Sequence, residues 1–210
     1  MGSAGVTPSR DRSAPARTDD PGATLPRLPA APSDAAAATA EAPWHAHFDA
    51  LARYHRWATV RLFEHVDRLG EADYRRDAGL FFRSVHGTLN HLLVAEDLWF
   101  PRFADGISNR IALDAELETD RAALRDRLLA AAGRWPPLIA GWPAARFDGR
   151  LDYTTTRGVD QSLPFTLTLA HIFNHGTHHR AQITAAITAM GHDCPELDLV
   201  WMLQAESARP

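Results

Sequence analysis

Residues 164–190 read PFTLTLAHIFNHGTHHRAQITAAITAM, and this stretch decides the fold. Its large apolar side chains recur at spacings of three and four residues, which predicts an amphipathic α-helix with one buried face. Gly191 follows directly and indicates the end of the helix, because glycine readily adopts the left-handed conformation of helix termini. The apolar stripe consists of Leu169, Ile172, Ile183, Ile187 and Met190.

Three helices of comparable length are expected earlier in the chain. Apolar periodicity predicts them from about Trp44 to Leu69, from about Phe82 to Phe103 and from about Leu113 to Ile139. Pro101 lies near the end of the second helix and predicts a kink or an early finish there, because proline lacks a backbone N–H. Four long helices are typical of a helix bundle.

The connection between the third and fourth helices, residues 141–162, has a different composition. Two short runs, Arg150–Thr156 and Ser162–Phe165, flank Gly158 and predict a small β-hairpin. A short last helix is expected over Leu197–Gln204. We therefore predict an all-α fold, a four-helix bundle with a small β-hairpin in the crossover between the third and fourth helices.

The first 43 residues are set apart by composition. They hold seven of the 14 prolines and no aromatic residue. Such a segment buries too little apolar surface to offset the entropy of ordering it, so we expect residues 1–43 to be a disordered extension and residues 44–210 to form one domain. The chain has one cysteine, Cys194, which excludes an internal disulfide and a cysteine-based zinc site and favours the cytoplasm.

The charges exclude several classes of protein. All 22 basic residues are arginines, and the absence of lysine excludes Walker-type phosphate loops and Schiff-base catalysis. The net charge is −4, and no arginine cluster is longer than Arg75-Arg76, so we expect no nucleic-acid partner. No window holds the roughly 18 apolar residues of a membrane helix, so we expect no membrane partner.

Eleven histidines are present, and four of them lie in the segment quoted above. At 100° per residue, His175 and His179 lie one turn apart beside the apolar stripe, whereas His171 and His178 fall outside it. In the second helix, His91 also borders the core stripe. One histidine from that helix and two from the fourth can therefore converge on a metal ion, although a histidine beside a core is more often a hydrogen-bonded packing residue.

Three segments carry a resemblance to the DinB-like family of bacterial metal-binding four-helix proteins, named for damage-inducible expression. They are Arg53–Ala58, Ser84–Leu93 and Phe173–Gln182, with Asn-His in the second and HxxxH followed by Arg-x-Gln in the third. The resemblance implies a three-histidine metal site at His91, His175 and His179, and a homodimer. The sequence departs from the family at His55 and Thr59, where asparagine is frequent, and at Ala181, where glycine is usual.

The resemblance also implies two chemistries, thiol transfer and metal-dependent hydrolysis. We expect a cytoplasmic enzyme that uses Zn²⁺ or Ni²⁺, with Fe, Mn or Cu as alternatives, to activate a low-molecular-weight thiol or water for attack on a small electrophile. Glu96 is a candidate general base or ligand-orienting residue, with an ion pair to Arg180 or Arg56 as its alternative. Arg180 is a candidate for binding acidic groups of a cosubstrate. A non-catalytic metal-binding stress-response protein remains the alternative reading.

Overall fold

The computed structural model describes residues 41–208. Helix α2 begins at Glu41, so Glu41–Pro43 are helical although we predicted them to belong to the disordered extension. The rest of that predicted extension, residues 1–40, lies outside the described residues.

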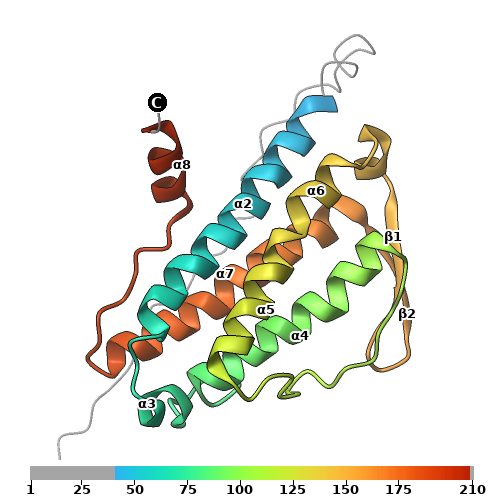
Figure 1. Ribbon diagram of the computed structural model, residues 1–210. Helices are drawn as coiled ribbons and strands as arrows, with labels where there is room; N and C mark the ends of the chain where they lie inside the picture. The colour runs from blue at the N-terminus through green and yellow to red at the C-terminus, as the bar shows by residue number, and fades with distance from the viewer. Residues whose placement is uncertain (1–40, 209–210) are drawn as a thin grey trace, which may run out of the picture.

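Four helical segments run side by side and form the bundle (Figure 1). They are α2 (Glu41–Val66), α4 (Val85–Ala104), α5 (Arg121–Gly133) continued by α6 (Trp135–Ala140), and α7 (Phe165–Ala189). Both α2 and α4 pack against α5 and α7, which places α2 and α4 on opposite corners of the bundle. The predicted four-helix bundle is confirmed.

Helix α4 passes through Pro101 and ends at Ala104, one residue past the predicted end, so of the two expected effects, a kink or an early finish, the early finish does not occur. Proline at this position cannot donate a backbone hydrogen bond to the carbonyl of Asp97, four residues earlier. The side chain of Asn109 supplies the missing donor, with Nδ2 lying 3.0 Å from the Asp97 carbonyl oxygen. The helix therefore completes its last turn around the proline.

The third helix is shorter than predicted. It was expected from about Leu113, but α5 begins at Arg121, where the Asp120 side chain accepts a hydrogen bond from the Ala123 amide and caps the helix. Residues 111–119 form a loop that lies against α4. A break at Arg134 separates α5 from α6, because Pro136 and Pro137 lack the N–H groups that would continue the α5 ladder and fit the first turn of a new helix.

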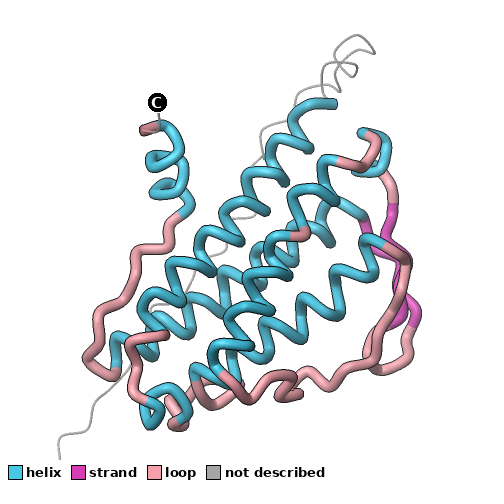
Figure 2. The backbone as a smooth tube through the Cα atoms, in the orientation of Figure 1, coloured by secondary structure: helices cyan, strands magenta, loops and turns pink. Residues whose placement is uncertain are grey.

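The hairpin, α3 and η1 lie at the ends of the bundle, and α8 lies beside it (Figure 2). Strands β1 (Arg150–Thr154) and β2 (Asp160–Pro164) pair antiparallel, which confirms the predicted hairpin. Two short elements lie in connections, α3 (Glu71–Arg75) after α2 and the 3₁₀ helix η1 (Ala144–Asp148) before β1. The last helix, α8 (Leu199–Ser207), packs against α2 and begins two residues later than expected.

The core contains two large hydrophobic clusters, one toward each end of the bundle, and a small third one of Tyr54, Ala58 and Met202 between α2 and α8. We call the two large clusters the Leu89 cluster and the Trp135 cluster. The Leu89 cluster comprises Leu62, Phe63, Val66, Leu69, Tyr74, Val85, Leu89, Leu92, Leu93, Leu124, Leu128, Ile183 and Ile187. The Trp135 cluster comprises Phe48, Ala52, Phe103, Trp135, Ile139, Phe147, Leu151, Phe165, Leu169, Ile172 and Phe173.

Buried polar side chains occupy the level between the two clusters. His55 on α2, Glu96 on α4 and Arg180 on α7 each stand along their helix between residues of the Trp135 cluster and residues of the Leu89 cluster. The candidate metal ligands lie near the same level of α4 and α7. None of the helices in residues 41–208 combines the length and hydropathy that a membrane span needs.

Candidate metal centre

Three histidines from two neighbouring helices converge in the bundle. His91 comes from α4, and His175 and His179 come from successive turns of α7. One ring nitrogen from each lies within 4.8 Å of those of the other two, and the Nε2 atoms of His91 and His175 are 3.1 Å apart. The structure thus brings together the three histidines that the sequence singled out.

Hydrogen bonds at the far side of two rings set their orientation. The Nδ1 of His91 lies 2.8 Å from the carbonyl oxygen of Leu113, and the Nδ1 of His179 lies 2.8 Å from Oε1 of Gln182. Carbonyl and amide oxygens only accept hydrogen bonds, so each Nδ1 carries the proton. The Nε2 of both rings is left with its lone pair free, as a metal ligand requires.

Burial keeps the three rings neutral. It lowers the pKa of His175 from 6.5 to about 3, helped by the neighbouring His179 and His91. It also lowers the pKa of His179 to about 4 and that of His91 below its usual value. At neutral pH all three are therefore in the form that binds a metal ion.

A tight turn before α4 places an aromatic ring on His91. The ring of Phe82 stacks on that of His91 with 3.7 Å between the centroids. The turn depends on Gly87, because a Cβ there would lie 2.2 Å from the carbonyl oxygen of Phe82. Arg83 adopts a left-handed backbone conformation with φ of 69°, which is uncommon outside glycine. The segment from Ser84 to Thr88 therefore has a structural role, because its turn places Phe82 against His91.

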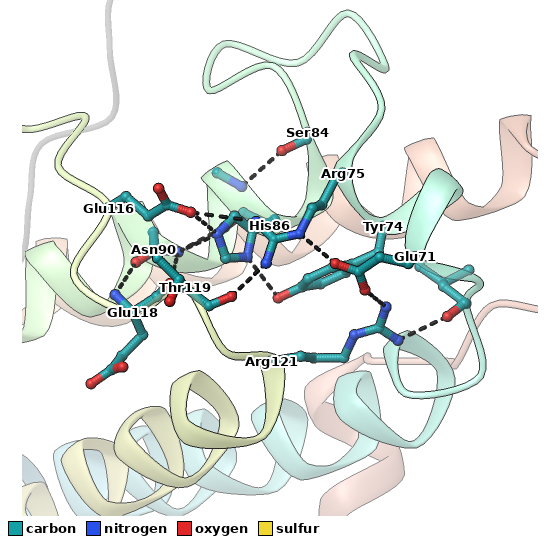
Figure 3. A network of polar contacts seen from close by, with 12 residues as sticks. Glu71, Tyr74, Arg75, Ser84, His86, Asn90, Glu116, Glu118, Thr119 and Arg121 are labelled. Atoms are coloured by element: carbon teal, nitrogen blue, oxygen red, sulfur yellow. Dashed lines mark hydrogen bonds and ion pairs between the residues drawn. The ribbon is translucent and has the colours of Figure 1, made fainter.

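The neighbour of His91, Asn90, holds the loop that supplies the Leu113 carbonyl. Its Oδ1 accepts hydrogen bonds from the backbone N–H groups of Leu117 and Glu118, at 2.7 and 2.9 Å. Its Nδ2 donates to the Glu118 carbonyl oxygen at 3.0 Å. The Asn90 side chain therefore binds both N–H and C=O groups of the loop backbone and holds the loop against α4 (Figure 3).

His86, one turn before Asn90, belongs to the same polar network and not to the three-histidine group (Figure 3). The ring is buried. Its Nδ1 lies 3.0 Å from the Tyr74 hydroxyl and its Nε2 2.5 Å from Oε1 of Glu116. The loop over residues 111–119 covers it, which explains the burial.

Glu96 and Arg180 lie in a buried network of their own. Arg180 donates from its guanidinium to Nδ1 of His55 at 3.0 Å, so His55 carries its proton on Nε2 and donates it to Glu96 at 2.7 Å. The second carboxylate oxygen of Glu96 accepts from the Trp135 indole at 2.9 Å. Glu96 therefore pairs with His55 and Trp135, and the expected direct ion pair with Arg180 or Arg56 is wrong.

The burial of Arg180 bears on its expected role. The side chain is 1% exposed and packs between His55 and the ring of Tyr54, with Thr177 as a further partner. A guanidinium in this position does not reach a solute, so the geometry does not support contact with acidic groups of a cosubstrate. Neither Glu96 nor Arg180 has a hydrogen bond to the three histidines.

The other histidines of α7 stay outside the group, as the helical wheel predicted. His171 and His178 are exposed, and the ring centroid of His171 lies 5.6 Å from that of His175.

Sequence reasoning missed the residues that position the ligands, Leu113, Gln182 and Phe82. Only Gln182 had a signal, the Arg-x-Gln that follows the HxxxH pair, since a backbone carbonyl such as that of Leu113 leaves no mark on a sequence.

Comparison with known proteins gives the same family as the motifs. The model of the DinB family matches residues 44–209. The chain belongs to the DinB family. Protein DinB of Bacillus subtilis is 23% identical over 167 residues, which cover 75% of this chain and 96% of that protein.

A solved structure shares the fold. YfiT from Bacillus subtilis, described as a probable metal-dependent hydrolase with an unusual four-helix bundle topology, matches with a TM-score of 0.58 and 16% identity, over 70% of this chain and 89% of that one. A DinB-like protein from Bacillus cereus matches with a TM-score of 0.48 and 16% identity, over 66% of this chain and 89% of that one. At this identity the likeness to YfiT establishes the bundle for this DinB-family chain.

Proposed function

We propose that this DinB-family protein is a metal-dependent enzyme that activates a small thiol or water for attack on a small electrophile. One observation carries the proposal. Three neutral imidazoles form the candidate ligand group, and within the described residues no carboxylate or thiolate joins them. A divalent ion held this way keeps its full charge and has coordination positions left for a small molecule, as in catalytic sites.

The donor set fits a divalent transition metal. Imidazole nitrogen suits Zn²⁺ and Ni²⁺, which we favour, as well as Cu²⁺ and Fe²⁺, while Mn²⁺ prefers oxygen ligands and fits less well. When bound, such an ion supplies a positive charge that stabilises the anion of a thiol or of water near neutral pH.

The chain's own residues orient the candidate ligands. The Leu113 carbonyl and the Gln182 amide hold two of the rings, and Phe82 covers one face of His91. His175 keeps part of its surface exposed to solvent, whereas His91 and His179 are buried, which supports approach of a small molecule from the His175 side.

The nucleophile would come from solution in either chemistry. Cys194, the only cysteine, lies in the segment between α7 and α8 with its thiol directed at the Pro195 carbonyl, and it is not part of the histidine group. A thiol would therefore be a cosubstrate, and a soft thiolate is a good ligand for Zn²⁺ or Ni²⁺. The description of YfiT as a probable metal-dependent hydrolase favours water as the second candidate nucleophile.

A non-catalytic metal-binding protein would more naturally saturate its ion with protein ligands. His171 and His178 are the candidates for a fourth ligand, and neither belongs to the group. This supports the enzyme over the storage or stress-response alternative.

Metal analysis of untagged protein, followed by cobalt substitution, tests the proposal. We expect about one divalent ion per chain and a sulfur-to-cobalt charge-transfer band when a small cellular thiol is added. Conjugation of that thiol to a model electrophile should be faster than with the His175→Ala variant. A cobalt spectrum that no thiol perturbs, together with metal-dependent ester or amide hydrolysis, would favour the hydrolase. If metal-loaded protein shows neither activity, the result supports the non-catalytic alternative.

A further inference from the structure

A cavity of about 350 Å³ lies where α4 and α7 meet the β-hairpin. Its walls come from α4, from the β-hairpin and from the first turns of α7. We call it the Trp99 cavity. Six of the side chains that line it are Trp99, Tyr153, Leu163, Leu167, Thr168 and His171.

We propose that the Trp99 cavity binds an uncharged apolar group, aromatic or branched aliphatic, of the small molecule whose reactive group lies at the three histidines. The inference rests on the proposed function, since that function places the reactive group at the metal ligands. It adds the class of substrate, a molecule with a reactive end and an apolar end.

The cavity begins one helical turn from the metal ligands. His171, which lines it, precedes His175 by four residues on α7, or about 6 Å along the helix axis. Trp99 lies two turns beyond His91 on α4, about 80° further around the helix, and Ala95, between them, has only a methyl group. The rings of Trp99 and His171 meet edge to face with 5.4 Å between centroids. A molecule only a few bonds long therefore reaches from the ligands into the cavity.

Arg102 holds two of the aromatic side chains that line the Trp99 cavity, Trp99 and Tyr153, in place. The guanidinium of Arg102 lies 4.6 Å from the ring centroids of both Trp99 and Tyr153, and it donates to the Thr154 carbonyl oxygen of β1 at 3.3 Å. Arg102 is 4% exposed, so this arrangement is internal. A cavity with fixed aromatic walls binds an apolar group without the entropic cost of ordering them.

The lining chemistry selects the class of group. Apart from His171, the lining side chains are aromatic or aliphatic, with the threonine hydroxyl already donated to the Pro164 carbonyl at 2.8 Å. Leu167 at the rim is 70% exposed, and covering such a side chain with an apolar group removes its surface from water. A volume of this size lies in the range of small-molecule sites.

The cavity on the other side of the histidines is a weaker candidate. It measures about 330 Å³ and is lined by Phe82, His86, Asn90 and Glu116. The side chains of His86, Asn90 and Glu116 are already paired with one another or with the loop over residues 111–119, as described above. The stacked ring of Phe82 also stands between this cavity and His91.

Fluorine NMR with 4-fluorobenzyl alcohol tests the proposal on the full chain. We expect saturable binding to the native protein, on the order of tenfold weaker in Trp99→Ala because a wall of the cavity is lost. Trp57→Ala is the matched control. Trp57 is another half-buried tryptophan, and it lines a cavity of about 320 Å³ beside α8. Its removal should leave the affinity unchanged. In cobalt-loaded protein the fluorine should relax faster than in zinc-loaded protein, because the probe lies close to the ion.

Several results would overturn the inference. They are no saturable binding, equal affinity in Trp99→Ala and native protein, equal loss in both tryptophan variants, or identical relaxation in the cobalt and zinc forms. If Trp99→Ala does not fold, Leu167→Glu replaces it and should weaken binding by placing a charge at the rim. A chain that binds no metal overturns the proposed function instead, while the variants of the metal-free protein still decide whether the cavity takes an aromatic group.

Discussion

His91 is tied to Leu113, 22 residues away, by a hydrogen bond of 2.8 Å from its Nδ1 to the backbone carbonyl oxygen. Leu113 lies in a loop that Asn90, the residue just before His91, anchors through three hydrogen bonds to the backbone. Asn90 therefore holds the loop against α4, and His91, the next residue, donates a hydrogen bond to a carbonyl oxygen of that loop. Only the Asn90-His91 pair of this arrangement could be recognised in the sequence.

Asn90→Ala should weaken metal binding although Asn90 is not a ligand. Without it the loop loses its anchor and the Leu113 carbonyl no longer fixes the His91 ring, which typically costs about 10- to 100-fold in metal affinity. Isothermal titration with Zn²⁺ measures this. Asn109→Ala is the control, because Asn109 lies in the same connection but bonds to Asp97. Equal effects of the two variants would contradict the role of Asn90.

Replacing any one of His91, His175 and His179 by alanine should remove most of the bound metal, because two imidazoles alone bind a divalent ion weakly. The control is His45→Ala, since His45 bonds to the Trp142 carbonyl in the Trp135-cluster end of the bundle. Metal content by atomic absorption after dialysis distinguishes them. Full occupancy in any of the three ligand variants would refute the assignment of that residue.

Metal affinity should persist to lower pH than for free imidazole. A histidine binds metal only when neutral, so affinity is present above its pKa and is lost as the pH falls through it. Burial lowers the pKa of His175 to about 3 and of His179 to about 4. We expect little change in cobalt affinity between pH 8 and pH 6.5 and the decline at more acidic pH. A tenfold loss already between pH 7.5 and pH 6.5, seen in the cobalt absorption band, would contradict this.

The sequence alone was sufficient for interactions within one helix. The spacing of His175 and His179, their position beside the apolar stripe and the exclusion of His171 and His178 all follow from 100° per residue. The same reasoning predicted the start of the third helix wrongly. Leu113 and Leu117 continue its four-residue period, but the Asn90 side chain binds the backbone amides of that segment and holds it as a loop. No local pattern reports such a contact from another helix.

Glu96 is a second residue whose contact with another helix could not be predicted from the sequence. Periodicity placed it beside the core, which is correct, since it is 3% exposed. Its partner His55 lies on the helix at the opposite corner of the bundle, 41 residues earlier, and only the packing of four helices brings the two together. The departure from the family pattern at His55 was visible in the sequence, but its consequence for Glu96 was not.

Glu96→Gln should destabilise the fold and leave the metal content intact. The buried guanidinium of Arg180 loses the negative charge that His55 links to it, and an uncompensated buried charge costs about 3 kcal/mol of unfolding free energy. Urea denaturation measures the loss. Glu64→Gln, which breaks an exposed pair with Arg61, should cost less than about 0.5 kcal/mol. Unchanged stability in Glu96→Gln would show that the network is not a buried charge pair.

Gly176→Ala tests the close packing around that network. A Cβ at Gly176 would lie 2.9 Å from the His55 ring and 2.9 Å from the Arg180 guanidinium, closer than side-chain atoms pack. Both neighbours are buried and hydrogen-bonded, so they cannot move aside without breaking the contacts that join α2 to α7.

We expect Gly176→Ala to lower the unfolding free energy by about 1 to 3 kcal/mol, as overpacking of a core does, despite the better helix propensity of alanine. Gly133→Ala is the matched control. Its Cβ would meet only the Arg56 side chain at 3.9 Å, an ordinary contact, so the substitution should be neutral or stabilising. Urea denaturation of both variants decides the point. If Gly176→Ala is as stable as Gly133→Ala, the close approach of His55 and Arg180 to α7 is not a constraint on the fold.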